Sequence, residues 1–198
     1  TFTGNLDVSS GTIKLDGNYP TGTSNVAIGD AALDDGSLSG GYNTAAGAGA
    51  LSANTSGAQN TAVGAFSSDA NTTGSYNAGF GQSSLGSNTT GDNNTGLGRG
   101  ALSANTTASN NTAVGKDALS TNTTGNGQTA LGAQALLVST TGSGNVAIGG
   151  PVSAVTNASM SANTTGYWNT AVGSGSLTSN TTGAQNVAVG LKALASNT

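Results

Sequence analysis

A 17-residue motif recurs along most of this chain and limits the folds that it can adopt. Its clearest copy is 111–127, Asn-Thr-Ala-Val-Gly-Lys-Asp-Ala-Leu-Ser-Thr-Asn-Thr-Thr-Gly-Asn-Gly. The glycine that ends the Asn-Thr-Ala-Val-Gly head recurs every 17 residues from Gly47 to Gly149, and again between Gly173 and Gly190. A fixed period of this kind is typical of stacked repeat proteins, in which each repeat contacts only its neighbours.

The composition of the repeat favours β structure. Each copy contains glycines together with asparagine and threonine, all poor residues for a helix interior, and it is too short for two packed helices. We therefore predict an all-β fold, a parallel β-solenoid (β-roll) of about ten 17-residue coils. Thr-Ala-Val is expected to form a short strand and the next glycine a corner. Asn-Thr-Thr-Gly is expected to make the return, where Asn and Gly tolerate left-handed backbone.

Two apolar columns are predicted to face the interior when repeat positions are counted from the leading Asn. Position 4 is apolar in every coil, position 9 is leucine in most, and position 3 is always Ala or Gly. The predicted core comprises, at position 4, Ile28, Val63, Phe80, Leu97, Val114, Leu131, Ile148, Val172 and Val189, and, at position 9, Leu51, Leu102, Leu119, Leu136 and Leu177. Such a core is thin. We therefore expect in-register Asn and Thr ladders and association of several chains to add stability.

Two segments depart from the repeat. Residues 1–24 precede it, and alternating apolar residues at Leu6–Val8 and Ile13–Leu15 predict an N-terminal β cap or junction. The solenoid domain is predicted to span 25–198, with an insertion in the eighth coil at about 150–162. Because the repeat resumes at Asn169, the insertion is expected to bulge outward as a loop.

The charge content argues against several classes of function. The 198 residues include 4 Lys and Arg, 8 aspartates and no His, Cys or Glu, for a net charge of −4. So few cations cannot neutralise a run of phosphates, so we expect no nucleic-acid partner. No apolar run approaches the ~20 residues of a membrane span, so no membrane insertion is expected. Scattered aspartates offer little for acid–base chemistry, and Asp30, Asp34 and Asp35 match no calcium loop. We predict no enzymatic activity, no metal site and no cofactor.

Aromatic residues at position 17 mark a candidate receptor contact. Exposed aromatic rings beside polar groups suit sugar faces and protein anchors alike. Trp168 and its neighbour Tyr167 share their coil with the insertion, whose apolar residues are predicted to wall a shallow pocket. The alternative is that both rings pack under the loop and keep it ordered. The candidate contact comprises Tyr42, Tyr76, Tyr167, Trp168, Val152, Val155 and Met160.

The repeat also resembles known families. Asn-Thr-Ala-Val-Gly-x-x-Ala-Leu-Ser-x-Asn-Thr-Thr-Gly resembles the repeats of phage tail-fibre proteins, and 4–17 resembles segments ahead of such repeats. Asn-Val-Ala-Ile-Gly, at 25–29 and 145–149, is similar to the head repeats of trimeric autotransporter adhesins. The resemblance implies a homotrimer of β-rolls, left-handed in the adhesin heads, in an extracellular virion fibre that attaches to a host cell-surface glycan or protein. A bacterial adhesin head and, less favoured, an ice-binding solenoid with stacked threonines stay open as alternatives.

Overall fold

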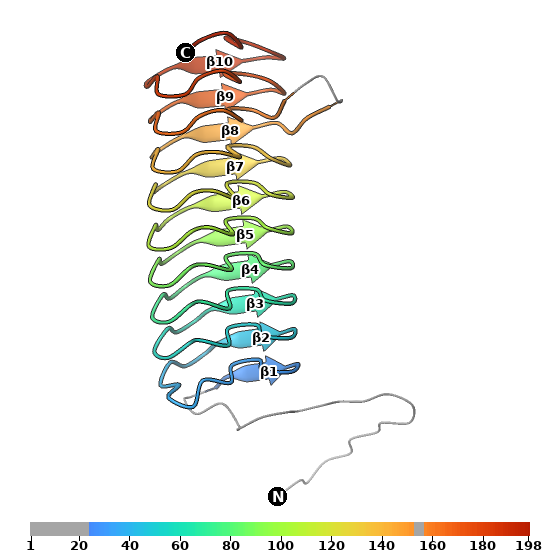
Figure 1. The fold of residues 1–198 in the computed structure, drawn as a ribbon, viewed down its shortest axis with the longest axis vertical. Helices are drawn as coiled ribbons and strands as arrows, with labels where there is room; N and C mark the ends of the chain where they lie inside the picture. Colours follow the sequence, from blue (N-terminus) through green and yellow to red (C-terminus); the bar gives the residue numbers. More distant parts are fainter. Residues whose placement is uncertain (1–23, 153–156) are drawn as a thin grey trace, which may run out of the picture.

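The chain winds into a single column of stacked coils, each contributing one short strand (Figure 1). This computed structural model describes residues 24–152 and 157–198, so the cap predicted for 1–24 lies, except for Ser24, outside the described residues. The strands are β1 (Val26–Ile28), β2 (Thr44–Ala46), β3 (Thr61–Val63), β4 (Ala78–Phe80), β5 (Thr95–Leu97), β6 (Thr112–Val114), β7 (Thr129–Leu131), β8 (Val146–Ile148), β9 (Thr170–Val172) and β10 (Val187–Val189). They form one ten-stranded sheet in sequence order, with every pair parallel. The predicted β-solenoid is confirmed.

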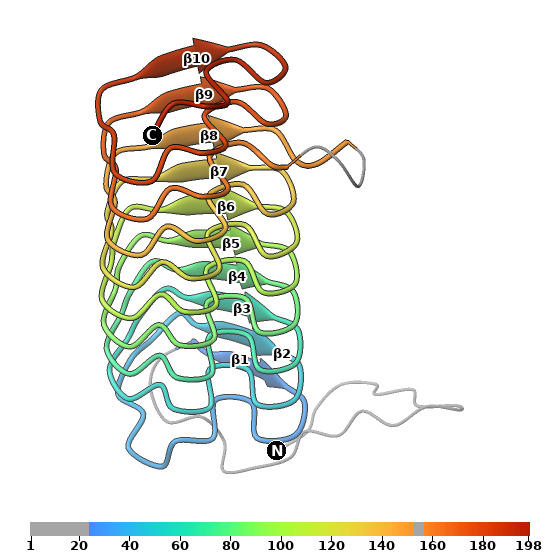
Figure 2. The same ribbon diagram turned by 45° about the horizontal axis from the view of Figure 1, so that its top comes forward.

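The coils stack in register, so each repeat position forms a column along the rod (Figure 2). Thr112 pairs with Thr129, Ala113 with Ala130 and Val114 with Leu131. The 24-residue step around the insertion leaves this register intact, because Ile148 pairs with Val172. A substitution at one position therefore affects mainly the same position in the two neighbouring coils.

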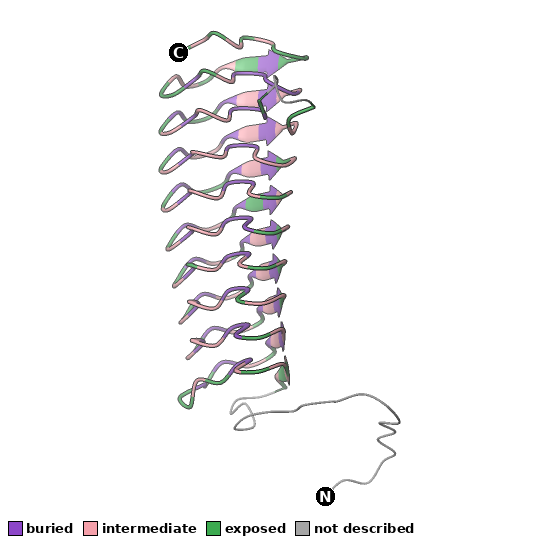
Figure 3. Ribbon diagram, turned by 45° about the vertical axis from the view of Figure 1, so that its right-hand side comes forward, coloured by how far each residue is buried: buried purple, intermediate pink, exposed green. Residues whose placement is uncertain are grey.

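The strand residues alternate between the two sides of the sheet, and this corrects part of the predicted core. Successive side chains of a strand point to opposite faces. The alanine at position 3 faces inward, with Ala113 0% exposed, so positions 2 and 4 face outward. In Figure 3 the strands carry purple for their buried residues beside pink or green for the others. The prediction that position 4 lies in the core is wrong. Its side chains are exposed at Ile28, Val63, Phe80, Leu97, Leu131 and Val189, and half-buried at Val114, Ile148 and Val172.

The leucine column at position 9 does form the apolar core. Leu51, Leu102, Leu119, Leu136 and Leu177 are all 0% exposed, as predicted. The repeat pattern did not predict their backbone conformation. These leucines adopt left-handed φ values, for example 51° at Leu119. Such a conformation costs roughly 1–2 kcal/mol for a residue with a Cβ atom. The cost persists because this turn aims the leucine side chain at the interior.

Two columns of buried asparagine flank the leucines. At position 12, Asn105 donates from Nδ2 to Asn88 Oδ1 at 2.7 Å and to the Ala108 carbonyl at 3.0 Å. At position 1, the Asn111 backbone N–H donates to Asn94 Oδ1 at 3.1 Å, and its Nδ2 donates to the Gly125 carbonyl at 2.9 Å. Each amide thus joins neighbouring coils and closes a turn within its own coil. The expected asparagine ladder is confirmed, in two copies.

Threonine at position 13 forms a further ladder outside the asparagines. Thr106 Oγ1 donates to the Thr123 carbonyl at 3.1 Å, and Thr123 Oγ1 donates to the Thr140 carbonyl at the same distance. The return segment does not, however, contain the left-handed backbone that we predicted there. In the described coils, left-handed non-glycine residues lie at positions 7, 9 and 17 instead. Glycine is favoured at position 15 for another reason, since a Cβ at Gly125 would collide with the Gly142 carbonyl of the next coil.

The insertion leaves the column at the carboxyl end of β8, and its described ends extend outward (Figure 1). The Ser159 N–H donates to the Gly149 carbonyl at 2.8 Å and closes the base of the loop. Met160 occupies position 9, where it is 0% exposed and takes the place of a leucine. The outward bulge is confirmed. The predicted range of 150–162 is too long, because Ser159 and Met160 already belong to the regular coil.

Candidate binding surfaces

The outer face of the sheet is the longest uniform surface of the described chain. Position 2 holds threonine in six strands and valine or alanine in the other four, and position 4 is apolar in all ten. None of these outward side chains carries a charge or an amide. Leu97 and Val189 are 48% and 69% exposed in the single chain. We refer to these two columns as the sheet face.

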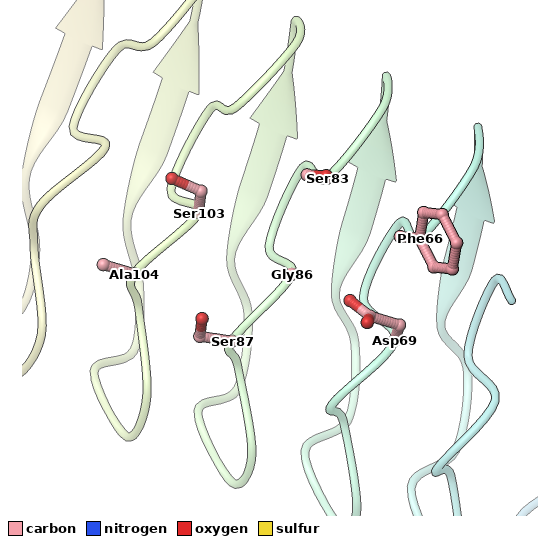
Figure 4. Close-up of a pocket in the computed structure, with 7 residues that line it drawn as sticks. All are labelled: Phe66, Asp69, Ser83, Gly86, Ser87, Ser103 and Ala104. Atoms are coloured by element: carbon pink, nitrogen blue, oxygen red, sulfur yellow. The ribbon is translucent and has the colours of Figure 1, made fainter.

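A groove crosses three successive coils on another side of the rod (Figure 4). Its volume is about 480 Å³, and we refer to it as the Asp69 groove. An aromatic ring and a carboxylate stand at one end, and serine hydroxyls follow across the next two coils. The lining residues are Phe66, Asp69, Ser83, Gly86, Ser87, Ser103 and Ala104.

Local departures from the repeat create the Asp69 groove. Phe66 stands at position 7 with a φ of 54°, and its side chain is 52% exposed. The ring rests on Gly49 of the preceding coil, where an added Cβ would lie 2.9 Å from Phe66 Cδ1. Gly86 stands at position 10, directly above Asp69, and a Cβ there would come within 3.3 Å of Asp69 Oδ1. A side chain at Gly86 would therefore narrow the groove beside the carboxylate.

Asp69 carries the chemically most distinctive group of the groove. Burial of its carboxyl raises its pKa, and only its own backbone N–H opposes this shift. Within the described chain, no salt bridge reaches it. Arg99 and Lys116 instead approach Asp117, at 3.5 Å and 3.7 Å. The Asp69 oxygens thus retain acceptor capacity toward the groove.

A second, smaller pocket lies at Tyr167 and Trp168. The two rings make an edge-to-face contact, with centroids 5.3 Å apart and planes at 83°. Hydroxyls of Thr141, Ser143 and Thr165 complete a pocket of about 290 Å³. The indole rests on the preceding coil at Gly144, yet Trp168 is 63% exposed. An open aromatic platform beside hydroxyl groups is therefore present, as the sequence suggested.

The remaining residues of the predicted contact do not join this pocket. The insertion leaves at the carboxyl end of β8, whereas Trp168 directly precedes the amino end of β9, and these ends lie at opposite edges of a parallel sheet. Val152 is exposed at 71%, Met160 is in the core, and Val155 lies outside the described residues. Tyr42 and Tyr76 are exposed in separate coils. The predicted pocket wall is therefore wrong for Val152 and Met160, whereas the prediction for Val155 and the alternative, in which both rings pack under the loop, depend on residues outside the described ones.

Sequence reasoning missed the Asp69 groove, although a signal was present. The third coil departs from the repeat at positions 7, 9 and 10 together, with Phe66, Ser68 and Asp69. The fourth coil adds Gly86 at position 10. Clustered departures in neighbouring coils indicate a local site, because the register brings equal positions together.

Among the described residues, the other acidic side chains do not gather into a metal-binding cluster. Asp35 Oδ1 accepts hydrogen bonds from the backbone N–H of Ser37, at 2.8 Å, and from its hydroxyl. The hydroxyl contact, followed by the backbone one, lowers the Asp35 pKa. In the described ranges, no three acidic, His or Cys side chains are placed to hold a metal ion.

None of the described residues forms a helix long and apolar enough to cross a bilayer.

Comparisons with protein-family models, curated proteins and solved structures find no match to this chain.

Proposed function

We propose that this chain is a structural and adhesive fibre segment that assembles as a homotrimer through its sheet face. The single observation that carries the proposal is the uncharged, largely apolar outer face of the ten strands. The resemblance of the repeats supports a phage tail fibre that attaches to a host cell surface. The three-chain assembly and the left-handed winding also derive from that resemblance. An adhesin head from a bacterial surface, the alternative, would use the same face.

The size of the sheet face supports a protein partner rather than exposure to solvent. Nine steps of about 4.8 Å between ten strands make the strip roughly 43 Å long, and a three-residue strand makes it roughly 10 Å wide. The sheet face is apolar at position 4 and mostly threonine at position 2, and it is comparable in size to the largest apolar patches of monomeric proteins, which often mark interaction sites. Charged residues such as Arg99 and Lys116 stand just beyond the strands and would border the contact.

Binding rather than catalysis agrees with the chemistry of the pockets. Glycoside hydrolysis uses two carboxyl groups on either side of the scissile bond. Asp69 is the one acidic residue among those that line the Asp69 groove, and the Tyr167–Trp168 pocket has none. We therefore propose a fibre that holds a ligand without cleaving it.

The assembly is tested by placing charge on the sheet face. Leu97→Asp combined with Leu131→Asp puts two carboxylates per chain into the proposed contact, where they would have no partner. The parent should scatter light as about three times the 18.7 kDa chain mass, and the variant as a single chain. Thr107→Asp, at an exposed position away from the strands, is the control and should keep the parent mass. A parent that is monomeric at micromolar concentration, or a variant that stays trimeric, contradicts the proposal.

One observation favours a second candidate. Thr95, Thr112 and Thr129 stand in register on the sheet face beside aliphatic residues, which gives the flat threonine array that ice binding requires. An ice-binding solenoid would keep this face open and remain monomeric. Thermal hysteresis of a monomeric parent that is lost on Thr112→Asp would support it. A trimer without hysteresis would exclude it.

A further inference from the structure

We infer that the Asp69 groove binds a neutral saccharide, with the Asp69 carboxylate accepting hydrogen bonds from adjacent sugar hydroxyls and the C–H face of the ring resting on Phe66. The inference builds on the proposed attachment to a cell surface, and names a site and a ligand class for it.

The composition of the groove matches a sugar. One exposed aromatic ring offers an apolar face, one carboxylate offers two strong acceptors, and the hydroxyls of Ser83 and Ser87 can both donate and accept, while Ser103 Oγ, which donates to the Ser120 carbonyl at 3.1 Å, can still accept. The volume of about 480 Å³ lies within the range of small-molecule sites. A purely apolar ligand would leave these polar groups without partners.

The charge of the groove selects a neutral ligand. A half-buried carboxylate that lacks a salt bridge gains most from O–H donors, because hydrogen bonds to a charged acceptor are stronger than neutral ones. The cations nearest in sequence, Arg99 and Lys116, approach Asp117 instead. Sialylated or phosphorylated sugars would meet an uncompensated negative charge. No other titratable group lines the groove.

The third coil contains two energetically unfavourable features next to each other in the sequence, at Ser68 and Asp69. Ser68 interrupts the leucine column, and its Oγ is the one buried side-chain polar atom of the described residues without a hydrogen-bond partner. Its neighbour Asp69 is desolvated without a counter-charge. Departures from local rules in natural proteins concentrate at functional sites. Both costs fall in the coil that supplies Phe66 and Asp69 to the groove.

Variants of the full chain separate a binding role from a structural one. Asp69→Asn keeps the shape and one carbonyl acceptor but removes the charge, and Phe66→Ala removes the stacking face. Asp34→Asn, at the same repeat position of the first coil, is the control, and Trp168→Ala reports on the smaller pocket as a rival site. The probes are neutral hexose oligosaccharides on a glycan array, with sialylated ones beside them. Dissociation constants of the bound members are then measured by titration calorimetry.

We expect neutral probes to bind the parent, with a dissociation constant raised at least tenfold by either groove variant and unchanged in Asp34→Asn. Binding should strengthen as the pH rises through the raised pKa of Asp69, because only the carboxylate form is the strong acceptor. Asp69→Asn should not lower the melting temperature, since it removes a desolvated charge. A parent that binds no neutral probe, prefers sialylated probes, or loses binding only on Trp168→Ala overturns the assignment. A trimeric mass with any of these results leaves the proposed fibre intact, so the two failures are distinguishable.

Discussion

The columns at positions 4 and 9 look alike in the sequence and occupy opposite environments in the fold. Both are apolar in nearly every coil, yet Leu119 is fully buried while Leu97 is 48% exposed. The strand pleat turns position 4 outward once the small residue at position 3 faces inward, and left-handed backbone turns position 9 inward. A regular apolar column therefore does not by itself say whether its side chains face the interior of the chain or its surface.

The sharpest test of this comparison places the same charge in each column. Leu119→Asp buries a carboxylate among leucines and alanines without a partner, which costs several kcal/mol. We expect it to abolish the cooperative thermal transition or lower its midpoint strongly, as monitored by circular dichroism. Val114→Asp places the charge in the outward-facing column at position 4, and the single chain should stay folded. Equal melting of the two variants would contradict the inward and outward assignment.

A smaller effect is expected from the asparagine ladder, which flanks only the inward column. Asn105→Ala leaves Asn88 Oδ1 without its 2.7 Å donor and Asn122 Nδ2 without its 3.0 Å acceptor. An unsatisfied buried polar group costs about 1–3 kcal/mol, so the midpoint should fall clearly without loss of the fold. The measurement is urea unfolding of both Asn105→Ala and Thr107→Ala. A similar loss from Thr107→Ala, at an exposed position, would show that the ladder adds nothing special.

The repeat alone predicts much of this fold, and its errors have a definite cause. The coil length, the parallel sheet, the buried leucines and the asparagine ladder follow from residue types at fixed spacing. Assigning position 4 to the interior was wrong because neighbours such as Ala113 and Val114 must face opposite sides of a strand, and Ala113 is the buried one. The small residue at position 3 indicated which of them is buried.

The candidate sites were harder to predict because they depend on contacts between coils. Phe66, Gly86 and Ser103 meet in one groove only after the coils stack in register. The predicted pocket wall at Val152 was wrong for a related reason. Val152 and Trp168 are near in sequence, but Val152 follows the carboxyl end of β8 and Trp168 precedes the amino end of β9. The length of a strand separates these two ends. Residues that are close in sequence can lie on opposite sides of the rod, because each coil carries the chain from one side to the other.

The smallest effect is expected where the inward column has a gap. Ser68 stands in the leucine column between Leu51 and Leu85, with its hydroxyl buried and unpaired. Ser68→Leu adds apolar burial and removes that unpaired group without changing the left-handed backbone that other leucines already adopt. The full gain of a buried leucine is about 1.5–3 kcal/mol. Because the small residues around Ser68 must adjust, we expect a stabilisation of roughly 1–2 kcal/mol in urea unfolding.

Thr124→Leu is the matched control, since it adds the same side chain at an exposed position and should change stability by less than about 0.5 kcal/mol. If Ser68→Leu destabilises instead, the third coil is shaped around a small residue, and its departure from the repeat extends from the surface into the core. If it stabilises while saccharide binding weakens, the serine is kept for the groove beside it. In the described coils Ser68 is the one polar residue of the inward column, and its coil also lines the Asp69 groove.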